Sequence, residues 1–367
     1  MSADPPVRWA VAGWGAGGRV FHAPMVASAD TMDLVAVVST NPERGREARD
    51  AGLSVVPDLR GLHDVGVEGV TITTPAGTHV DLAIEALELG LHVVVDKPFA
   101  TTAADAARVI AAQSAGAVLT VYQNRRWDGD FLTLRQLVDE GRIGRVDRFE
   151  SRVERFRPDL PRWTRDRSSV EGGGVLVDLG PHLIDQAVQL LGPVRRVFAD
   201  LAVLGDDRVS EDDAVVMLRH EGGARSTIVA SVHAAAEGPR FRMSGELGGV
   251  RIDGFDPQEE WLFSGESPAS LGERWGSDDP GRTARMETSD GVQELALQRG
   301  RWDTFYPAVA AAVRTGSPVP VSPADALHTA AIFDAARLST VAEAWIDIDP
   351  ALRIDSPPDR AEGGREW

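Results

Sequence analysis

The 367-residue chain contains no cysteine. This excludes disulfide bonds, thiolate metal sites, iron–sulfur clusters and cysteine nucleophiles. The chain also lacks an uninterrupted apolar run of about 18 residues, which a membrane-spanning helix needs. Residues 1–6 have neither the basic stretch nor the apolar run of a signal peptide. We therefore expect no membrane partner, a cytoplasmic location and no bound metal ion.

The chain has fewer basic than acidic residues. The 38 Lys and Arg residues are outnumbered by 56 Asp and Glu residues, which gives a net charge of −18. Such a chain repels a polyanion unless its basic residues are concentrated, and no basic stripe is visible, so nucleic acid is not an expected partner. The 43% hydrophobic and 26% charged residues are typical of a folded globular protein.

Lysine is almost absent, because Lys97 is the only lysine among the 38 basic residues. Arginine therefore serves at every other basic position. Lysine differs from arginine in that it can lose its proton and offers a compact ammonium group. We favour a chemical role for Lys97 as an acid, base or hydrogen-bond donor; the alternative is that one lysine has persisted by chance.

The first third of the chain alternates short apolar strands with amphipathic helices. Strands are expected at 7–12, 34–38, 69–73, 92–95 and 117–122. Helices are expected between them at 19–29, 42–51, 78–89 and 103–114. Short connections between such elements indicate a parallel sheet covered on both faces. We predict an α/β chain whose residues 1–125 form a doubly wound Rossmann domain.

The pattern changes after residue 125. Alternating stretches predict strands at 146–156, 194–203, 214–220, 226–234 and 240–245. Helices are expected at 131–140, 181–191, 302–314 and 323–344. Residues 126–355 should thus form a second, α+β domain with a large, open, mostly antiparallel sheet. Segment 256–291, rich in Gly, Ser, Pro and acidic residues, is predicted to be a long loop, and 356–367 a disordered tail.

A glycine motif, Gly13-Trp14-Gly15-x-x-Gly18, lies between the first expected strand and the first helix. In this context the first glycine permits a tight turn, the second lets a pyrophosphate approach the backbone, and the third lets helix and strand pack closely. The helix N-terminus then receives the anion. We favour dinucleotide binding by this turn, Trp14 included, over an ordinary glycine turn.

The end of the second expected strand bears on the choice of cofactor. About 20 residues beyond the glycines, an NAD-specific site usually carries an acidic residue on the ribose. Here the chain has Ser39 and Thr40, with Arg44 nearby. No carboxylate stands there to repel a 2′-phosphate, so we expect NADP(H), with NAD possible. The alternative for Arg44 is a solvated helix residue.

The motif Thr74-Pro75-x-x-x-His79 follows the strand expected at 69–73. It therefore lies at the carboxyl edge of the sheet, where cofactors bind in this architecture, and we count Thr74, Pro75 and His79 as cofactor-binding candidates. The alternative is turn chemistry with a cap for the following helix.

Two further segments supply candidate catalytic groups. The strand at 92–95 delivers Lys97 to the same carboxyl edge. In the second domain, a glycine run at 172–174 leads to Asp178 and to His182 at the start of an expected helix, with Pro181 in its first turn. The positive helix end lowers the pKa of such an imidazole and keeps it neutral as a base. Asp185 and Gln186, one turn further on, are placed to orient the ring.

Taken together, these motifs identify a family. The sequence resembles the Gfo/Idh/MocA oxidoreductases, and among them the NADP-dependent scyllo-inositol dehydrogenases. The resemblance is carried by Gly13-Trp14-Gly15-x-x-Gly18, Phe21-His22-Ala23-Pro24, Thr74-Pro75-x-x-x-His79, Asp96-Lys97-Pro98, Asp178-x-Gly180-x-His182-x-x-Asp185, Asn124-Arg125-Arg126-Trp127-Asp128-x-Asp130-Phe131 and Trp275-Gly276.

The resemblance implies roles for particular residues. The catalytic lysine falls on Lys97, the substrate-binding aspartate on Asp178 and the catalytic histidine on His182. Asp96 departs from the family, which commonly has glutamate before the lysine, so the contact of that carboxylate is in question. The resemblance also implies a homodimer or homotetramer assembled through the C-terminal sheet.

The expected reaction is reversible oxidation of a secondary hydroxyl in a sugar or cyclitol. His182 would take the hydroxyl proton and Lys97 would hydrogen-bond the same oxygen, while Asp178 would hold a neighbouring hydroxyl. Asn124, Arg126 and Trp127, with Arg125, would line the substrate pocket; for the arginines, a surface salt bridge is an equally open alternative.

Two other classes of function stay open. One is a non-catalytic protein that senses NADP or a sugar, since a dinucleotide fold does not fix function. The other is an enzyme that retains NAD and cleaves a glycoside through transient oxidation. A methyltransferase with a glycine turn would leave Lys97 and His182 unexplained.

Overall fold

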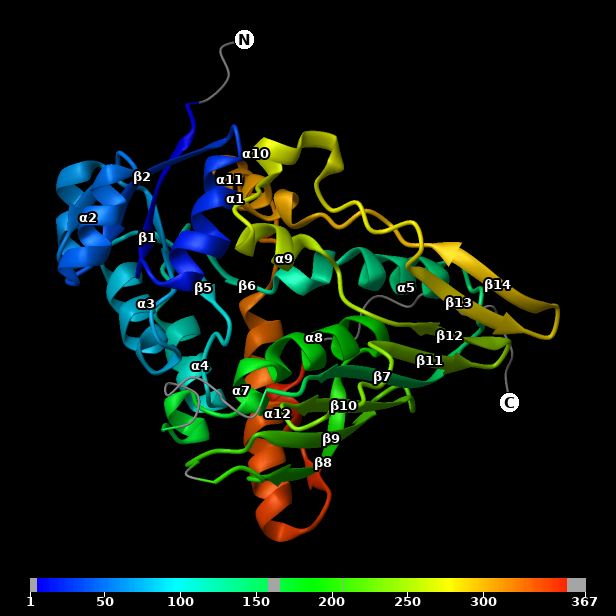
Figure 1. Ribbon diagram of the computed structural model, residues 1–367. Helices are drawn as coiled ribbons and strands as arrows, with labels where there is room; N and C mark the ends of the chain where they lie inside the picture. The colour runs from blue at the N-terminus through cyan, green and yellow to red at the C-terminus, as the bar shows by residue number, and fades with distance from the viewer. Residues whose placement is uncertain (1–4, 158–165, 207, 355–367) are drawn as a thin grey trace.

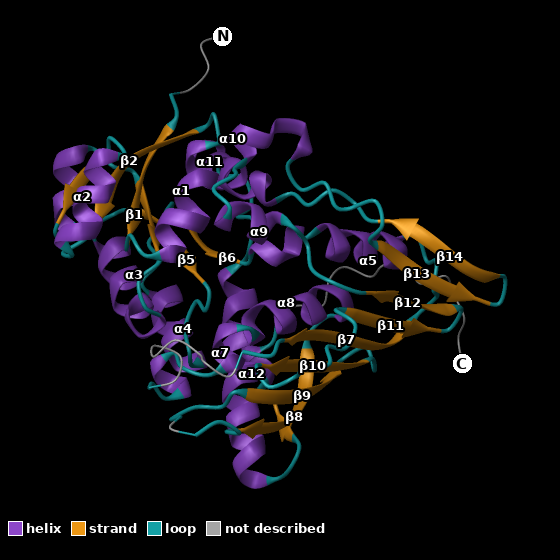
Figure 2. Ribbon diagram, viewed as in Figure 1, coloured by secondary structure: helices purple, strands orange, loops and turns teal. Residues whose placement is uncertain are grey.

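The computed structural model describes residues 5–157, 166–206 and 208–354 and contains two sheets (Figures 1 and 2). The predicted tail at 356–367 lies outside the described residues. No helix within the described part of the chain has the length and apolar character that crossing a membrane requires.

The first sheet has six parallel strands in the order β3-β2-β1-β4-β5-β6. The strands are β1 (Val7–Ala12), β2 (Met32–Val38), β3 (Ser54–Val56), β4 (Gly69–Ile72), β5 (His92–Asp96) and β6 (Leu119–Tyr122). This order confirms the predicted doubly wound Rossmann sheet, in which the strand order reverses between β1 and β4. The short strand β3 was not predicted.

Helices cover both faces of this sheet. They are α1 (Ala23–Ala27), α2 (Pro42–Asp50), α3 (His79–Glu88), α4 (Ala103–Ala111) and, from the end of the chain, α11 (Phe305–Thr315). The helices α1 and α11 contact β2, whereas α3 contacts β4 and β5. The helix expected at 19–29 begins earlier than predicted, as a π-helical stretch (Gly17–His22) that continues into α1.

The second sheet has nine strands in the order β14-β13-β12-β11-β7-β10-β9-β8-β15. They are β7 (Val146–Glu154), β8 (Val194–Ala202), β9 (Asp213–His220), β10 (Arg225–Ser231), β11 (Phe241–Gly245), β12 (Gly248–Ile252), β13 (Thr283–Thr288), β14 (Gly291–Ala296) and β15 (Ile346–Asp347). Among the strands described in this sheet, only β7 and β10 pair in parallel. The prediction of an open, mostly antiparallel sheet is confirmed.

Helices cover one face of the second sheet (Figure 2). They are α5 (Gly129–Asp139), α7 (Val175–Asp178), α8 (Gly180–Leu191) and α12 (Pro323–Ala342). In β7, Phe149, Ser151 and Val153 are buried on this side. The residues between them point the other way and are charged, with Arg152 pairing with Glu150 at 2.9 Å. This alternation is typical of an antiparallel sheet with only one face in the core.

The predicted loop at 256–291 is wrong. The segment contains helices α9 (Gln258–Phe263) and α10 (Pro268–Leu271) and strand β13, and ends where β14 begins. Its few large apolar side chains are the reason: Leu262, Trp275 and Met286 are 4%, 0% and 2% exposed. They are too widely spaced to produce a periodic pattern, yet each fills a place in the core.

The C-terminal segments return to the first sheet. Trp302, Phe305, Tyr306 and Val321 are buried in one cluster with Trp9 of β1. Residues far apart in sequence therefore share the core beneath the Rossmann sheet, although the strands around 146–252 form a separate core. The domain boundary at residue 125 stays a prediction.

The glycine turn after β1 has the geometry that close approach of a ligand needs. Gly13 has φ of +100°, and a Cβ atom on Gly18 would overlap the Gly13 carbonyl oxygen. A Cβ on Gly15 would meet nothing nearer than the Arg44 guanidinium, at 3.9 Å. Gly13 and Gly18 are thus required by the backbone, whereas the space over Gly15 is open.

This difference predicts that Gly15→Ala folds normally but binds NADPH about tenfold or more weakly, a loss of about 1.4 kcal/mol or more, because the methyl group occupies the space a pyrophosphate needs. Gly18→Ala should instead lose stability, by about 1–3 kcal/mol, through overpacking. Fluorescence titration and thermal unfolding measure the two effects. Gly222→Ala, where a Cβ would meet no atom within 4 Å, is the control. Wild-type affinity in Gly15→Ala would contradict this account of the turn.

Candidate active site

The carboxyl ends of four parallel strands place the predicted groups along one edge of the first sheet. The glycine turn follows β1, Thr74 follows β4, Lys97 follows β5, and Asn124 follows β6. The second domain faces this edge through α7 and α8, which carry Asp178 and His182. The edge where ligands bind in doubly wound sheets is therefore the edge that carries the candidate catalytic side chains.

Lys97 and Asp178 form an ion pair that joins the two domains. The Lys97 Nζ donates to Asp178 Oδ1 at 2.9 Å and to the Asp178 carbonyl oxygen at 2.9 Å. Burial alone would lower the pKa of the Lys97 ammonium, but Asp178 and Asp96 outweigh burial and raise the pKa. Lys97 is therefore held as a charged hydrogen-bond donor. Its side chain is 23% exposed and that of Asp178 is 33% exposed, so both are accessible to a substrate.

His182 lies in the first turn of α8, with Pro181 in the predicted helix-starting position. The residue is 7% exposed, and its buried Nδ1 has no hydrogen-bond partner among the residues that the structure describes. Burial, followed by the charges of Lys97, Arg125 and Arg240, holds the pKa of His182 well below its usual value. The expectation of a lowered pKa is met, although burial rather than the helix end is the main cause. The imidazole is neutral and free to accept a proton.

The predicted orientation of His182 by Asp185 and Gln186 is wrong. Asp185 accepts two hydrogen bonds from Arg126, at 2.7 and 2.5 Å. Gln186 donates to the Arg125 carbonyl oxygen at 3.0 Å and accepts from Arg240 at 2.9 Å. Both side chains turn away from His182 because buried arginines compete for them, and a buried guanidinium needs acceptors.

The arginines of the 124–127 turn are engaged in ion pairs. Arg126 also donates to Asp325 of α12 at 2.7 Å and is 7% exposed, so the salt-bridge alternative describes it, as a buried pair rather than a surface one. Arg125 pairs with Asp128 and with Glu259 of α9. Substrate contact by Arg126 is therefore not supported by its geometry.

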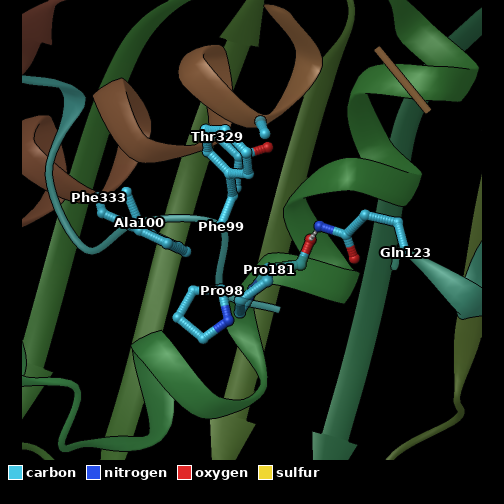
Figure 3. A pocket seen from close by; sticks show the side chains of 8 residues that line it. Pro98, Phe99, Ala100, Gln123, Pro181, Thr329 and Phe333 are labelled. Carbon is cyan, nitrogen blue, oxygen red and sulfur yellow. Dashed lines mark hydrogen bonds between the residues drawn. The ribbon is translucent and has the colours of Figure 1, made fainter. Parts of the chain in front are cut away.

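Asn124 and Trp127 lie in the same turn. Asn124 is 5% exposed, and the Trp127 ring is half-buried against Phe305, with ring centroids 5.8 Å apart. Their contact with a substrate stays a prediction. Gln123, the residue before this turn, lines the pocket drawn in Figure 3 together with Pro181. Its side chain donates to the Pro181 carbonyl oxygen at 3.3 Å. The pocket is lined mainly by apolar side chains and does not contain Lys97 or His182.

Glu259 is a site residue that the sequence analysis missed. Its carboxylate is 25% exposed, pairs with Arg125, and lies in the field of Lys97 and Arg155. Burial alone would raise its pKa, but Arg125 and Arg155 lower the pKa, so Glu259 is ionised. It lies within the segment predicted to be a loop, and a single acidic residue in an acidic segment carries no local signal.

Of the candidates around the ribose position, Ser39 and Thr40 lie between β2 and α2, and Arg44 lies in the first turn of α2. Ser39 Oγ accepts from the Asn41 backbone N–H at 3.3 Å, and Asn41 caps α2 by accepting from Glu43 and Arg44. Arg44 is exposed and points its guanidinium toward Gly15. An exposed cation beside the open part of the glycine turn is suitably placed for a phosphate group. Thr40 follows Ser39 and is also exposed.

The motif at 74–79 supports the loops rather than presenting free side chains. The Thr74 and Thr78 hydroxyl oxygens lie 2.7 Å apart, and Thr78 also donates to the Pro75 carbonyl oxygen. His79 is buried, with its nitrogens 2.8 Å from the Pro98 carbonyl oxygen and 2.7 Å from that of Thr74. The turn-chemistry alternative thus describes this motif, and His79 braces the loop that carries Lys97.

Trp14 is likewise a core residue. It is 5% exposed and packs with Val11, Ala23, Val37 and Ala48 beneath the glycine turn. Any contact with a cofactor is therefore through its backbone. The glycine run of the second domain also packs closely, because a Cβ on Gly172 would lie 2.8 Å from the Ala76 Cβ.

The residues present fit a nicotinamide dinucleotide. Space over Gly15 is open and Arg44 stands beside it. A Cβ on Gly17 would lie 3.3 Å from Asp96 Oδ2, so the turn borders the residue that precedes Lys97. Among the residues that the structure describes, no three His, Asp or Glu side chains come together as a metal site.

Comparison with known families agrees with this geometry. Residues 7–123 match the model of the oxidoreductase family with an NAD-binding Rossmann fold, and residues 131–251 match the GFO/IDH/MocA C-terminal domain.

Similar proteins cover nearly the whole chain. The oxidoreductase YdgJ of Escherichia coli is 39% identical over 87% of this chain and 92% of its own length. The NADP⁺-dependent scyllo-inositol 2-dehydrogenase IolW of Bacillus subtilis is 30% identical over 91% of this chain and 94% of its own. Among solved structures, an oxidoreductase from Klebsiella pneumoniae is 32% identical, with a TM-score of 0.84, over 94% of this chain and 96% of that chain.

These matches span both domains and confirm the resemblance inferred from the motifs. The chain belongs to the GFO/IDH/MocA oxidoreductase family and is an NAD(P)-dependent dehydrogenase.

Proposed function

We propose that this protein catalyses the reversible, NADP(H)-dependent oxidation of a secondary hydroxyl group in a sugar or cyclitol. The observation that carries the proposal is the arrangement of three side chains at the cofactor edge. The Lys97 ammonium is paired with Asp178 at 2.9 Å, and His182, in the field of Lys97, is neutral and its Nδ1 has no partner among the described residues.

Each of these groups has a task that its environment suits. His182 accepts the hydroxyl proton, because its lowered pKa keeps the imidazole unprotonated. Lys97 donates a hydrogen bond to the same oxygen as negative charge develops there. Asp178 has one carboxylate oxygen on Lys97 and a second oxygen available to accept a neighbouring hydroxyl. A bound nicotinamide supplies the acceptor for the hydride.

The named relatives support a polyol as substrate. Besides IolW, they include a myo-inositol 2-dehydrogenase of Thermotoga maritima, 32% identical over 60% of this chain and 67% of its own length. A levoglucosan dehydrogenase is 27% identical over 85% of this chain and 88% of its own. A polyol is consistent with a site whose accessible groups are carboxylates and cations rather than apolar side chains.

The preference for NADP(H) over NAD(H) rests on the residues after β2. Ser39, Thr40 and Arg44 supply two hydroxyls and a cation, and no carboxylate occupies the position that selects NAD. The NADP⁺ dependence named for IolW supports the same choice.

Assembly is a further part of the proposal. We propose a homodimer or homotetramer formed through the uncovered face of the second sheet, where Met217, Phe198 and Trp345 interrupt the charged residues. A cytoplasmic location stays a prediction.

The proposed activity is tested by following nicotinamide absorbance with a panel of inositols, aldoses and their keto forms, with NADP(H) and NAD(H) in parallel. Turnover with one stereochemical class is the expected result. No change in nicotinamide absorbance with any member of the panel, while the cofactor still binds, would contradict the proposal. A sensor would then bind NADP without turnover, whereas an NAD-retaining glycosidase would purify with bound cofactor and release sugar from a glycoside.

Replacement of the catalytic groups gives a second test. Lys97→Ala and His182→Ala should each lower kcat by about 10²–10⁴-fold, the usual contribution of a positioned acid or base. Cofactor affinity, measured by NADPH fluorescence, should be kept in both variants. Unchanged turnover in either variant would remove that residue from the mechanism.

Arg44→Ala tests the cofactor preference. Because a hydrogen bond to a charged group contributes about 1.5–3 kcal/mol, loss of the guanidinium should weaken NADP⁺ about tenfold or more while leaving NAD⁺ affinity unchanged. Arg46→Ala, on the same helix and also exposed, is the matched control. Equal affinity of the wild type for both dinucleotides, or equal weakening of both in Arg44→Ala, would contradict the preference.

A further inference from the structure

A chain of polar side chains crosses the apolar core beneath the first sheet. Trp9 Nε1 donates to Thr71 Oγ1 at 2.8 Å, Thr71 Oγ1 lies 2.8 Å from the Tyr306 hydroxyl, and that hydroxyl lies 2.7 Å from His22 Nδ1. The four residues come from β1, β4, α11 and the stretch Gly17–His22, and each is at most 1% exposed. We refer to Trp9, Thr71, Tyr306 and His22 as the relay.

The three hydrogen bonds of the relay all donate in the same direction, from Trp9 towards His22. An indole N–H can only donate, so Thr71 accepts from Trp9. Thr71 then donates to Tyr306, and Tyr306 donates to Nδ1 of His22. Burial raises the pKa of Tyr306, so its hydroxyl keeps the hydrogen. In the reverse direction the Thr71 hydroxyl hydrogen would have no acceptor among the described residues. Since Nδ1 accepts, the ring hydrogen of a neutral His22 is on Nε2.

The relay ends at the residue that precedes Lys97. His22 Nε2 is buried and has no hydrogen-bond partner among the described residues; Asp96 Oδ2 faces it at 3.5 Å, a contact longer than a hydrogen bond. The same Oδ2 accepts from the Thr73 hydroxyl at 3.3 Å, and Asp96 Oδ1 accepts from the Lys97 backbone N–H at 2.8 Å. Asp96 therefore connects the relay to the peptide unit that carries Lys97. The family commonly has glutamate at this position, so the contacts of the shorter Asp96 side chain were in question. They are with Thr73, the Lys97 backbone N–H and, at a longer distance, His22.

We propose that His22, held by Tyr306, Thr71 and Trp9, is a positioning residue that fixes the Asp96 carboxylate behind Lys97 and so maintains the Lys97 ammonium in its catalytic place. The consequence for turnover rests on the proposed function, whereas the effect on Lys97 itself does not.

Electrostatics supports this direction of action. Lys97 is faced by Asp96 of β5, Asp178 of α7, His182 of α8, Arg125 and Glu259. Of these, Asp178 and Asp96 raise the pKa of Lys97 against the effect of burial. Asp178 accepts its hydrogen bond from Lys97 itself, so its position depends on the lysine. Asp96 is approached from the other side by His22, at the end of the relay.

Asp96 in turn depends on its own neighbours. Burial would raise the pKa of its carboxyl, but His22, Lys97 and His79 outweigh burial and lower the pKa. With the relay broken, the carboxylate keeps only its hydrogen bonds from Thr73 and the Lys97 backbone N–H and is less firmly fixed. Lys97 then loses part of the negative charge that keeps it protonated. The Lys97 pKa then falls.

The protonation of Lys97 can be measured selectively, because Lys97 is the only lysine of the chain. Protein grown with lysine labelled at ¹³Cε shows one lysine resonance, whose shift with pH reports the protonation of Lys97.

The chain also offers a matched pair of variants, because its only two tyrosines, Tyr122 and Tyr306, both lie against His22. Tyr306 hydrogen-bonds to it, whereas the Tyr122 ring is tilted against it, with ring centroids 4.4 Å apart, and the Tyr122 hydroxyl has no partner among the described residues.

The titration is compared in the wild type, Asp96→Asn, Tyr306→Phe, Thr71→Val and Tyr122→Phe. We expect Asp96→Asn to lower the Lys97 pKa by about one pH unit, the effect of removing a nearby opposite charge. Tyr306→Phe and Thr71→Val should lower it in the same direction by less, and Tyr122→Phe should leave it unchanged. In turnover assays, kcat should fall in Tyr306→Phe and Thr71→Val while the KM for NADP⁺ is kept.

Two results would overturn the relay: wild-type titration of Lys97 in both Tyr306→Phe and Thr71→Val, or an equal shift in Tyr122→Phe. Thr71→Val conserves side-chain shape, so it keeps the test available if Tyr306→Phe folds poorly. The Lys97 titration is measured without substrate. A wild type that lacks dehydrogenase activity would therefore contradict the proposed function alone, whereas an active wild type with unshifted variants would contradict the relay alone.

Discussion

The ion pair between Lys97 and Asp178 is the interaction on which the candidate site depends. It connects the end of β5 in the first sheet to the end of α7 in the second domain, with both hydrogen bonds at 2.9 Å. An ammonium group that is largely buried is costly unless a carboxylate accompanies it. Catalytic competence is therefore tied to docking of the two domains, because only the docked arrangement brings a charged donor, a free carboxylate oxygen and the neutral His182 to one edge.

Docking is secured by parts of the chain that are distant in sequence. Trp302 and Tyr306 insert into the core of the first sheet, and Arg126 is shared between Asp185 of α8 and Asp325 of α12. The same elements hold functional groups: Tyr306 reaches His22 behind Asp96, and α8 carries His182. Packing and chemistry thus use the same contacts, and a substitution in the relay is expected to affect Lys97 without touching substrate.

The sequence was sufficient for features that arise locally. The glycine turn, the strand periods and the position of Lys97 after a buried strand follow from neighbouring residues, and topology then places the carboxyl ends together. Features that depend on a distant partner were missed. Asp185 is one turn from His182 on α8, but buried Arg126 binds it instead, and Glu259 gains its place only because α9 packs beside Arg125. The core side chains of 256–291 are likewise spaced too irregularly for a periodic signal.

The dependence of kcat/KM on pH tests the central claim most directly, since this ratio reports the ionisation of the free enzyme. His182 is buried beside the Lys97 cation, so its pKa lies well below the ordinary 6.5. Its neutral form persists on acidification, and activity is lost only as the pH falls through that lowered pKa. The account predicts an acid-side inflection well below pH 6.5 for oxidation of the preferred polyol. An inflection at or above the ordinary histidine value would contradict a neutral, buried His182 acting beside a charged Lys97.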